Sequence, residues 1–172
     1  GASAIHALAR IITSLEQLND LARGVSVNAG VVSGGTRSNV VAETARAEVD
    51  VRVGRAEDAP RLEAALRAVG VDDPRITVSV AGAIDRPPFE RTAAVAALYA
   101  TAKEVAGELG FDLGEGATGG ASDGNFTGAL GVPTLDGLGA VGGGAHAIDE
   151  HVRLALLPSR AALAAGLLRR LS

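Results

Sequence analysis

The chain has 172 residues, of which 47% are hydrophobic, so it can form one large domain or two small ones with a real core. Only 2% of the residues are aromatic and the net charge is −4, so the chain lacks the stacking platforms and basic surface that nucleic acids need. No polybasic run indicates binding to an anionic membrane. There is no cysteine, so any metal must be held by His, Asp or Glu.

Signals for targeting are missing from the sequence. We find no signal peptide and no transmembrane segment, and we therefore expect a cytoplasmic protein. The first residue falls directly into a helical pattern, which suggests a fragment or a processed piece of a longer chain.

The first half of the chain alternates between helical and extended patterns. Apolar spacing predicts an amphipathic helix over residues 2–18 and a second helix over 57–69. Between them lie an apolar, β-branched strand at 25–32 and a strand at 45–53 whose residues alternate between apolar and charged. A further strand is predicted at 76–80. This order indicates an α+β sandwich of two layers.

A change of composition at Arg86-Pro87-Pro88 marks a domain boundary, because two prolines force extended backbone and exclude a central strand. We therefore divide the chain into residues 1–82 and 83–172. Thr92 is the expected N-cap of a helix that Gly110 ends, and Ser122 is expected to cap a short helix. The remaining predicted elements are a strand at 132–138 and a helix from Pro158 to Leu171.

Two glycine-rich segments are the strongest signs of a ligand site, because glycine lets backbone pass close to a ligand or metal. One is Gly119-Gly120-Ala121-Ser122-Asp123 and the other is Gly142-Gly143-Gly144-Ala145-His146. Both are equally compatible with ordinary turns and a surface histidine. His146 with the nearby Asp149 and Glu150 is an incomplete metal site, because catalytic zinc needs three protein ligands. Asp123 is a ligand, an orienting group or simply a negative charge at a helix start.

Three polar residues are candidates for binding a carboxylate. Arg52 lies on the polar face of the 45–53 strand, Asn39 lies in the loop before that strand, and Arg86 precedes the stiff Pro-Pro pair. A guanidinium binds a carboxylate through two parallel hydrogen bonds. Taken alone, the position of Arg52 favours a solvated surface charge, and surface arginine is also a common explanation for a residue such as Arg86.

The sequence does not indicate a phosphate-binding loop or a serine hydrolase. The triple glycine has no accompanying Lys and Ser/Thr, so it is not a phosphate loop, and neither Ser33 nor Ser122 has the context of a serine nucleophile.

Taken in order, these motifs resemble the C-terminal half of the zinc-dependent aminoacylase and glutamate carboxypeptidase family of metallopeptidases. The resemblance covers essentially the whole chain. It is carried by five ordered segments: Ser38-Asn39-Val40-Val41, Asp50-Val51-Arg52, Arg86-Pro87-Pro88-Phe89, Gly119-Gly120-Ala121-Ser122-Asp123 and Gly144-Ala145-His146-Ala147-Ile148-Asp149-Glu150.

The resemblance implies a fold and an activity. Residues 1–82 would be an α+β two-layer sandwich that serves as the lid, or dimerisation, domain, and residues 83–172 would be the C-terminal part of an α/β zinc-peptidase catalytic domain. The enzyme would use two zinc ions to hydrolyse an amide next to a carboxylate-bearing amino acid, either in an N-acyl amino acid or at a C-terminal glutamate. It would form a homodimer through the lid.

The resemblance also implies residue roles. His146 would be a zinc ligand, Asn39, Arg52 and Arg86 would reach the substrate, and the segment of Gly119, Gly120, Ser122 and Asp123 would line its pocket. The other family ligands and the general base belong to an N-terminal half that this sequence does not contain. We therefore expect this chain to be inactive without that half.

Two alternatives to an enzyme portion stay open. The chain could be an interaction module that dimerises and has no chemistry of its own, or a protein that binds small carboxylates through Arg52 and Arg86.

Overall fold

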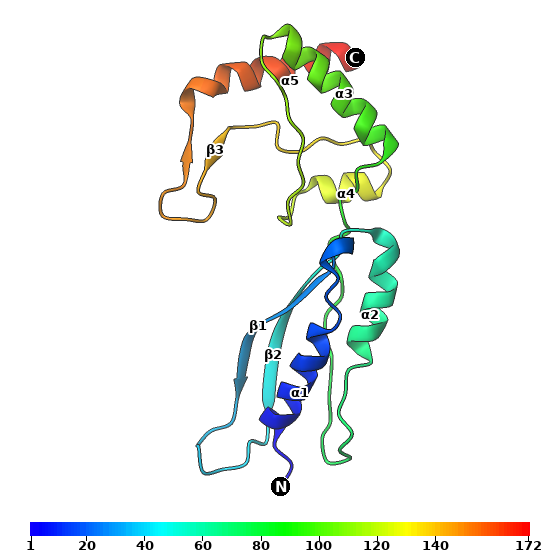
Figure 1. The fold of residues 1–172 in the computed structure, drawn as a ribbon, viewed down its shortest axis with the longest axis vertical. Helices are drawn as coiled ribbons and strands as arrows, with labels where there is room; N and C mark the ends of the chain where they lie inside the picture. Colours follow the sequence, from blue (N-terminus) through cyan, green and yellow to red (C-terminus); the bar gives the residue numbers. More distant parts are fainter. The chain divides into compact units, whose positions relative to one another are not determined.

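The computed structural model describes all residues from Gly1 to Ser172. The chain folds into two compact units, unit 1, Gly1–Phe89, and unit 2, Glu90–Ser172, which are described separately (Figure 1). The division follows the Pro-Pro pair, seven residues after the boundary expected at 82. No helix in the structure combines the length and the apolar character that a membrane span requires.

Unit 1 contains a helix that lies on a two-stranded antiparallel sheet. Helix α1, Ala4–Glu16, begins where the Ser3 hydroxyl accepts a hydrogen bond from the His6 N–H at 3.4 Å. Its buried residues are Ala7, Ile11 and Leu15, spaced by four so that they share one face. The helix predicted over 2–18 is confirmed, although Ile5, which belongs to the same apolar periodicity, is 42% exposed.

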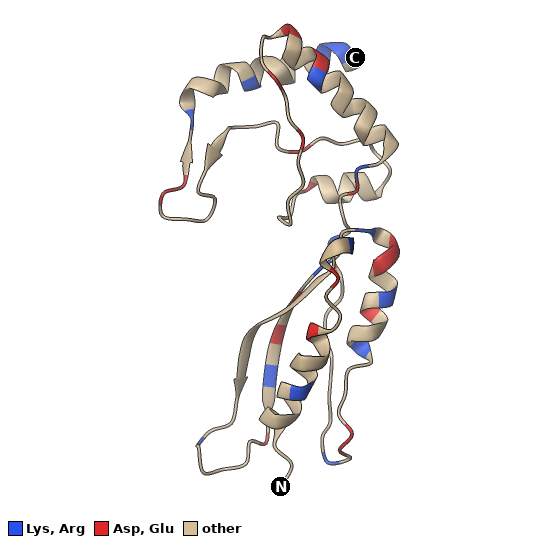
Figure 2. Ribbon diagram, in the orientation of Figure 1, with Lys and Arg blue, Asp and Glu red and all other residues tan.

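The sheet pairs β1, Ser26–Gly34, with β2, Ala45–Arg52. Ser26 pairs with Arg52 at one end and Gly34 with Ala45 at the other, with a bulge between Ala29 and Val31. Half-buried and exposed residues alternate strictly along β2, so the predicted alternation is confirmed. Figure 2 shows the charges of β2 in successive bands of opposite sign.

A second helix completes unit 1. A short 3₁₀ turn, η2 at Ala56–Asp58, leads into α2, Ala59–Arg67, which confirms the helix predicted at 57–69. Another 3₁₀ turn, η1 at Leu21–Arg23, connects α1 to β1. Ile11, Leu15, Val25, Val27 and Leu62 form the buried core of this unit.

Residues 76–80 do not form the predicted strand. Val78 packs against the core, but the segment makes no ladder with β1 or β2 and the sheet has only two strands. Alternating burial thus occurs here without strand pairing. Unit 1 is a mixed α/β layer arrangement with a sheet smaller than the sequence predicts.

Unit 2 is built on two helices. The Thr92 hydroxyl accepts a hydrogen bond from the Val95 N–H at 3.2 Å and caps α3, Ala93–Glu108, as predicted. Helix α5, Leu157–Leu171, has Pro158 in its first turn and packs against α3. The buried core consists of Ala102, Val105, Ala106, Leu113, Leu163 and Leu167.

The remaining elements of unit 2 are short. Helix α4 spans Gly124–Ala129, the strands β3, Gly142–Gly143, and β4, His151–Val152, form a two-residue ribbon, and the 3₁₀ turn η3, Leu154–Leu156, joins β4 to α5. The strand predicted at 132–138 is wrong, because the segment has no partner strand to receive its backbone hydrogen bonds.

Candidate functional site

His146 lies in the exposed loop, residues 144–150, that joins β3 to β4 in a hairpin. The Ala147 N–H donates to the Gly144 carbonyl at 2.8 Å, which closes a turn with His146 at its third position. His146 has a φ of +66° and is the one non-glycine residue with a positive φ. This backbone conformation costs a residue with a side chain about 1–2 kcal/mol. Such strain is concentrated at functional sites, and the imidazole is exposed.

Two of the three glycines before His146, Gly142 and Gly144, have a structural reason. A Cβ atom on Gly142 would overlap the carbonyl oxygen of His151, and a Cβ atom on Gly144 would lie 3.1 Å from the carbonyl oxygen of Asp149. Gly144 also has a φ of +68°. The two arms of the hairpin therefore approach each other so closely that only glycine fits.

The second glycine-rich segment precedes α4. The Gly124 N–H donates to the Ser122 hydroxyl at 3.0 Å, and the Ser122 N–H donates to the Asn125 side-chain oxygen at 3.0 Å. The N-cap position itself is occupied by Asp123, not by the predicted Ser122. The Gly120 N–H donates to the Thr118 hydroxyl at 3.2 Å, whereas Gly119 and Asp123 are exposed.

Within unit 2 the two glycine-rich segments do not lie side by side. Figure 1 shows the β3–β4 hairpin and α4 in separate places along the unit. The structure of this chain alone therefore does not bring Ser122 and Asp123 to His146.

The candidate residues of unit 1 are also spread out. Asn39 is exposed in the loop that joins β1 to β2, whereas Arg52 is the last residue of β2, opposite Ser26. Seven residue steps separate Arg52 from Ala45, so the sheet alone places roughly 23 Å between the Asn39 loop and Arg52. A small substrate cannot contact both side chains in one copy of unit 1.

The two arginines have different surroundings. The Arg52 Nε lies 2.8 Å from the Asp50 Oδ2, and 56% of the Arg52 side chain is exposed. Arg86 is half-buried in the segment that follows Gly82. Arg52 thus remains accessible to a ligand while Asp50 holds its guanidinium.

The acidic side chains whose pKa values are shifted all form ion pairs with arginines. Three hydrogen bonds of 2.9–3.2 Å from the Arg23 guanidinium hold the pKa of the buried Asp58 below its usual value. Bonds from Arg75 lower the pKa of Asp73 to about 2, and bonds from Arg91 lower that of Glu115. A general base works best with a pKa near the working pH, so these three carboxylates are unsuited to that role.

The structure contains no cluster of three His, Asp or Glu side chains that could hold a metal ion. An exposed neutral imidazole is a good zinc ligand, but His146 supplies a single nitrogen. The residues of this chain therefore cannot hold a zinc ion on their own, and His146 fits the role of one ligand among others supplied from elsewhere.

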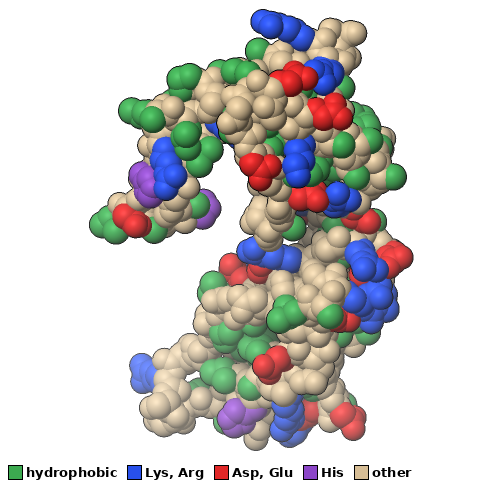
Figure 3. All heavy atoms as spheres, turned by 45° about the horizontal axis from the view of Figure 1, so that its top comes forward, with side chains coloured by type: hydrophobic (Ala, Val, Ile, Leu, Met, Phe, Trp, Pro, Cys, Tyr) green, Lys and Arg blue, Asp and Glu red, His purple; other side chains and the backbone are tan.

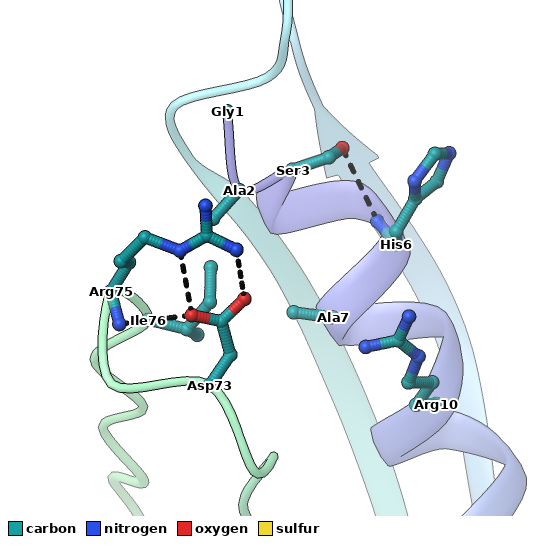
Figure 4. Close-up of a pocket in the computed structure, with 9 residues that line it drawn as sticks. All are labelled: Gly1, Ala2, Ser3, His6, Ala7, Arg10, Asp73, Arg75 and Ile76. Atoms are coloured by element: carbon teal, nitrogen blue, oxygen red, sulfur yellow. Dashed lines mark hydrogen bonds and ion pairs between the residues drawn. The ribbon is translucent and has the colours of Figure 1, made fainter.

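The hollows in the surface are small and lie elsewhere. One of about 150 Å³ at the start of α1 is lined by His6, Arg10, Asp73 and Arg75, and the last two bond to each other (Figure 4). Ligand sites for small molecules usually have ~300–1,000 Å³. This hollow contains no candidate residue and is too small for a substrate of the expected class.

The fold belongs to the mixed α/β class. It consists of an antiparallel sheet with a helix on it, and of a second unit with two helices and an exposed hairpin that carries a histidine. Comparison with known proteins adds a family match and two relatives. The family model of the peptidase dimerisation domain matches residues 1–70. Carboxypeptidase G2 from Pseudomonas sp. (strain RS-16) is 29% identical over 172 residues, which cover 98% of this chain and 41% of that protein.

A second relative is succinyl-diaminopimelate desuccinylase from Xanthomonas euvesicatoria pv. vesicatoria (strain 85-10). It is 32% identical over 160 residues, which cover 92% of this chain and 39% of that protein. The chain thus spans about two fifths of the length of these curated relatives. These matches support the aminoacylase and carboxypeptidase family, with homology to part of the length of its members.

Proposed function

We propose that this chain is the lid and C-terminal portion of a dizinc amidohydrolase that cleaves an amide next to a carboxylate-bearing amino acid. The strained, exposed histidine in the glycine hairpin is the observation that carries the proposal. The names of the two relatives, a carboxypeptidase and a desuccinylase, support hydrolysis as the reaction class.

In this proposal His146 is one zinc ligand, and the remaining ligands and the general base come from outside these 172 residues. A single imidazole cannot hold two ions, and the carboxylates with lowered pKa values are committed to arginines. Zinc, when bound, polarises the carbonyl group that is to be hydrolysed. The chain by itself is therefore inactive.

The substrate carboxylate is bound by arginine and amide groups of this chain. Arg52 and Arg86 offer guanidinium forks, and the backbone of Gly119 and Gly120, with Ser122 and Asp123, lines the pocket. Because Asn39 and Arg52 lie at opposite ends of the β1–β2 sheet, we assign them to different active sites of a homodimer. Each copy would then contribute Asn39 to one site and Arg52 to the other.

The first experiment compares two polypeptides: this chain and the product of the complete open reading frame that contains it. We expect the longer product to bind zinc in a ratio of roughly two ions per active site and to hydrolyse N-acyl amino acids or C-terminal glutamyl amides. The 172-residue chain should do neither. Turnover by the purified short chain with added zinc would contradict the proposal, as would a longer product without zinc.

The second experiment tests the role of Arg52 in the longer product. If its guanidinium binds the substrate carboxylate in a closed site, Arg52→Ala should lose about 2–5 kcal/mol of transition-state binding, measured as kcat/KM. Arg52→Lys should recover only part, because an ammonium group lacks the planar fork.

Arg46 provides the matched control for Arg52. It lies on the same exposed face of β2, is 76% exposed and pairs with Glu48, so Arg46→Ala removes the same charge from the same surface. We expect it to leave kcat/KM nearly unchanged. Equal losses in the two alanine variants would show that general electrostatics explains the effect of Arg52.

The dimerisation-domain match favours a second candidate, an interaction module without chemistry of its own. The sheet has only two strands, so β1 has an open edge, and the exposed Val31 and Val32 lie on that strand. Sedimentation of the 172-residue chain tests this candidate. A dimer of the short chain, with no zinc and no hydrolysis by the longer product, would favour the module over the enzyme.

A further inference from the structure

Arg160 makes an unusual set of hydrogen bonds to backbone. Its Nε lies 3.1 Å from the Leu138 carbonyl oxygen and 3.0 Å from that of Gly139, and its Nη2 lies 2.8 Å from that of Gly137. One guanidinium thus binds three consecutive carbonyls. Hydrogen bonds from a charged donor are stronger than neutral ones, and the planar fork fixes their geometry.

The helix that carries Arg160 is firmly anchored. One turn further along α5, Leu163 is fully buried, and Leu167 is 6% exposed. Both pack against α3 residues in the core of unit 2. Arg160 therefore holds the segment that it binds in a fixed position relative to this core.

That segment leads directly into the hairpin of His146. Gly139 is followed by Ala140 and Val141, and the Val141 carbonyl accepts a hydrogen bond from the Arg153 N–H at 2.8 Å. The other arm of the hairpin runs through η3 into α5 itself. One arm is thus joined to α5 by the chain and the other by the guanidinium of Arg160.

The hairpin has little else to hold its first arm. The β3–β4 ladder contains two residue pairs, and the tip residues 144–150 are exposed. Ile148 at the tip and Leu154 after β4 are apolar and exposed, so they add no buried contacts in this unit. Figure 3 shows hydrophobic side chains on the surface of unit 2. Without Arg160 the first arm keeps the short ladder, the hydrogen bond between Val141 and Arg153, and the packing of Leu135 and Leu138.

We propose that Arg160 is a positioning residue that fixes the His146 hairpin on the α3–α5 core. The proposal rests on the proposed function where it concerns zinc and catalysis, and on geometry alone where it concerns the hairpin. Arg160 touches neither substrate nor metal in this role. It acts by keeping the strained turn of His146 in one place.

The first test uses the 172-residue chain and requires no activity. In Arg160→Gln we expect the Arg153 amide, which bonds to Val141, to exchange its hydrogen about tenfold faster or more. Amides in the core turns of α3 should keep their exchange rates. The imidazole NMR signals of His146 should shift or broaden, and Arg160→Lys should restore part of the protection.

Arg170→Gln is the matched control. It removes the same charge from the same helix, but Arg170 bonds to Glu104 and Glu108 at the surface. We expect this variant to leave exchange in the hairpin unchanged. Unchanged hairpin exchange and unchanged His146 signals in Arg160→Gln would overturn the proposal whatever the enzyme does.

The second test uses the product of the complete reading frame. Arg160→Gln should weaken zinc binding and lower kcat about tenfold or more, with a smaller change in KM, because the substrate-binding arginines are untouched. If His146→Ala keeps full zinc content while Arg160→Gln still loosens the hairpin, the positioning role stands and the proposed ligand is wrong. If His146→Ala loses zinc while Arg160→Gln changes neither zinc binding nor kcat, Arg160 does not position the site.

Discussion

Gly166 in α5 packs against α3 with no room for a side chain. A Cβ atom placed on it would lie 2.5 Å from the Cγ1 atom of Val105, which is 3% exposed. Valine in a helix strongly prefers one side-chain rotamer, so Val105 cannot easily move aside. Gly166→Ala therefore tests how closely the two helices pack.

Two effects of opposite sign decide how much Gly166→Ala changes the free energy of unfolding. Replacing glycine by alanine inside a helix favours folding by about 0.8–1 kcal/mol. Adding a methyl group to a well-packed core opposes folding by about 1–3 kcal/mol. The distance of 2.5 Å is shorter than real Cβ atoms show, so we expect a penalty in the upper part of that range. The free energy of unfolding should therefore fall by about 1–2 kcal/mol in Gly166→Ala.

Tyr99 gives a probe that reports on unit 2 alone. It is the only tyrosine of a chain without tryptophan, and its hydroxyl donates to the Leu113 carbonyl at 2.6 Å. Denaturant unfolding followed by tyrosine fluorescence therefore measures the stability of this unit. Gly107→Ala is the control, because nothing lies within 4 Å of a Cβ atom there. Stabilisation by Gly166→Ala as large as that by Gly107→Ala would refute the close packing of α3 and α5.

Two further predictions concern unit 1 and the hairpin. The pKa of Asp58 is lowered in the folded chain, because Arg23 bonds to its carboxylate. The stabilisation from this bond is fully present at a pH above 3.8, the usual carboxyl pKa, and it is lost as the pH falls through the lowered pKa. Far-UV circular dichroism in denaturant should show a weaker loss of stability on acidification for Asp58→Asn than for wild type or the exposed control Asp72→Asn. In the product of the complete reading frame, His146→Ala should abolish activity and lower zinc content, whereas His6→Ala should change neither. Unchanged zinc in His146→Ala would exclude that ligand.

Local patterns predict the helices and two strands well, since the strands expected at 25–32 and 45–53 are found as β1 and β2. The Thr92 cap and the alternation along β2 depend on neighbouring residues, and both are found as expected. The predicted strands at 76–80 and 132–138 fail because a strand requires a partner, and no periodicity within a segment shows whether one is present. Unit 2 likewise contains only the β3–β4 ladder of two residue pairs, because its other extended segments have no partner strand.

Arg160 shows what sequence reasoning misses at the candidate site. Its partners are backbone carbonyls 21–23 residues earlier in the chain, and such acceptors exist at every position. No residue type, spacing or charge pattern marks them. The glycine run before His146 is visible in the sequence, but the overlap that requires Gly142 depends on the opposing strand.

Asn39 and Arg52 show a limit of a different kind. Strand periodicity predicts which face of a sheet a residue occupies, and it places Arg52 on the polar face correctly. It does not predict which end of the sheet a loop occupies, because that depends on where the chain turns back. The turn between Gly34 and Ala45 puts Asn39 at the end away from Arg52. Two residues that suit one carboxylate in the sequence therefore lie too far apart in one copy of unit 1 to contact the same small substrate. In the homodimer that we propose, one substrate would meet Asn39 of one copy and Arg52 of the other.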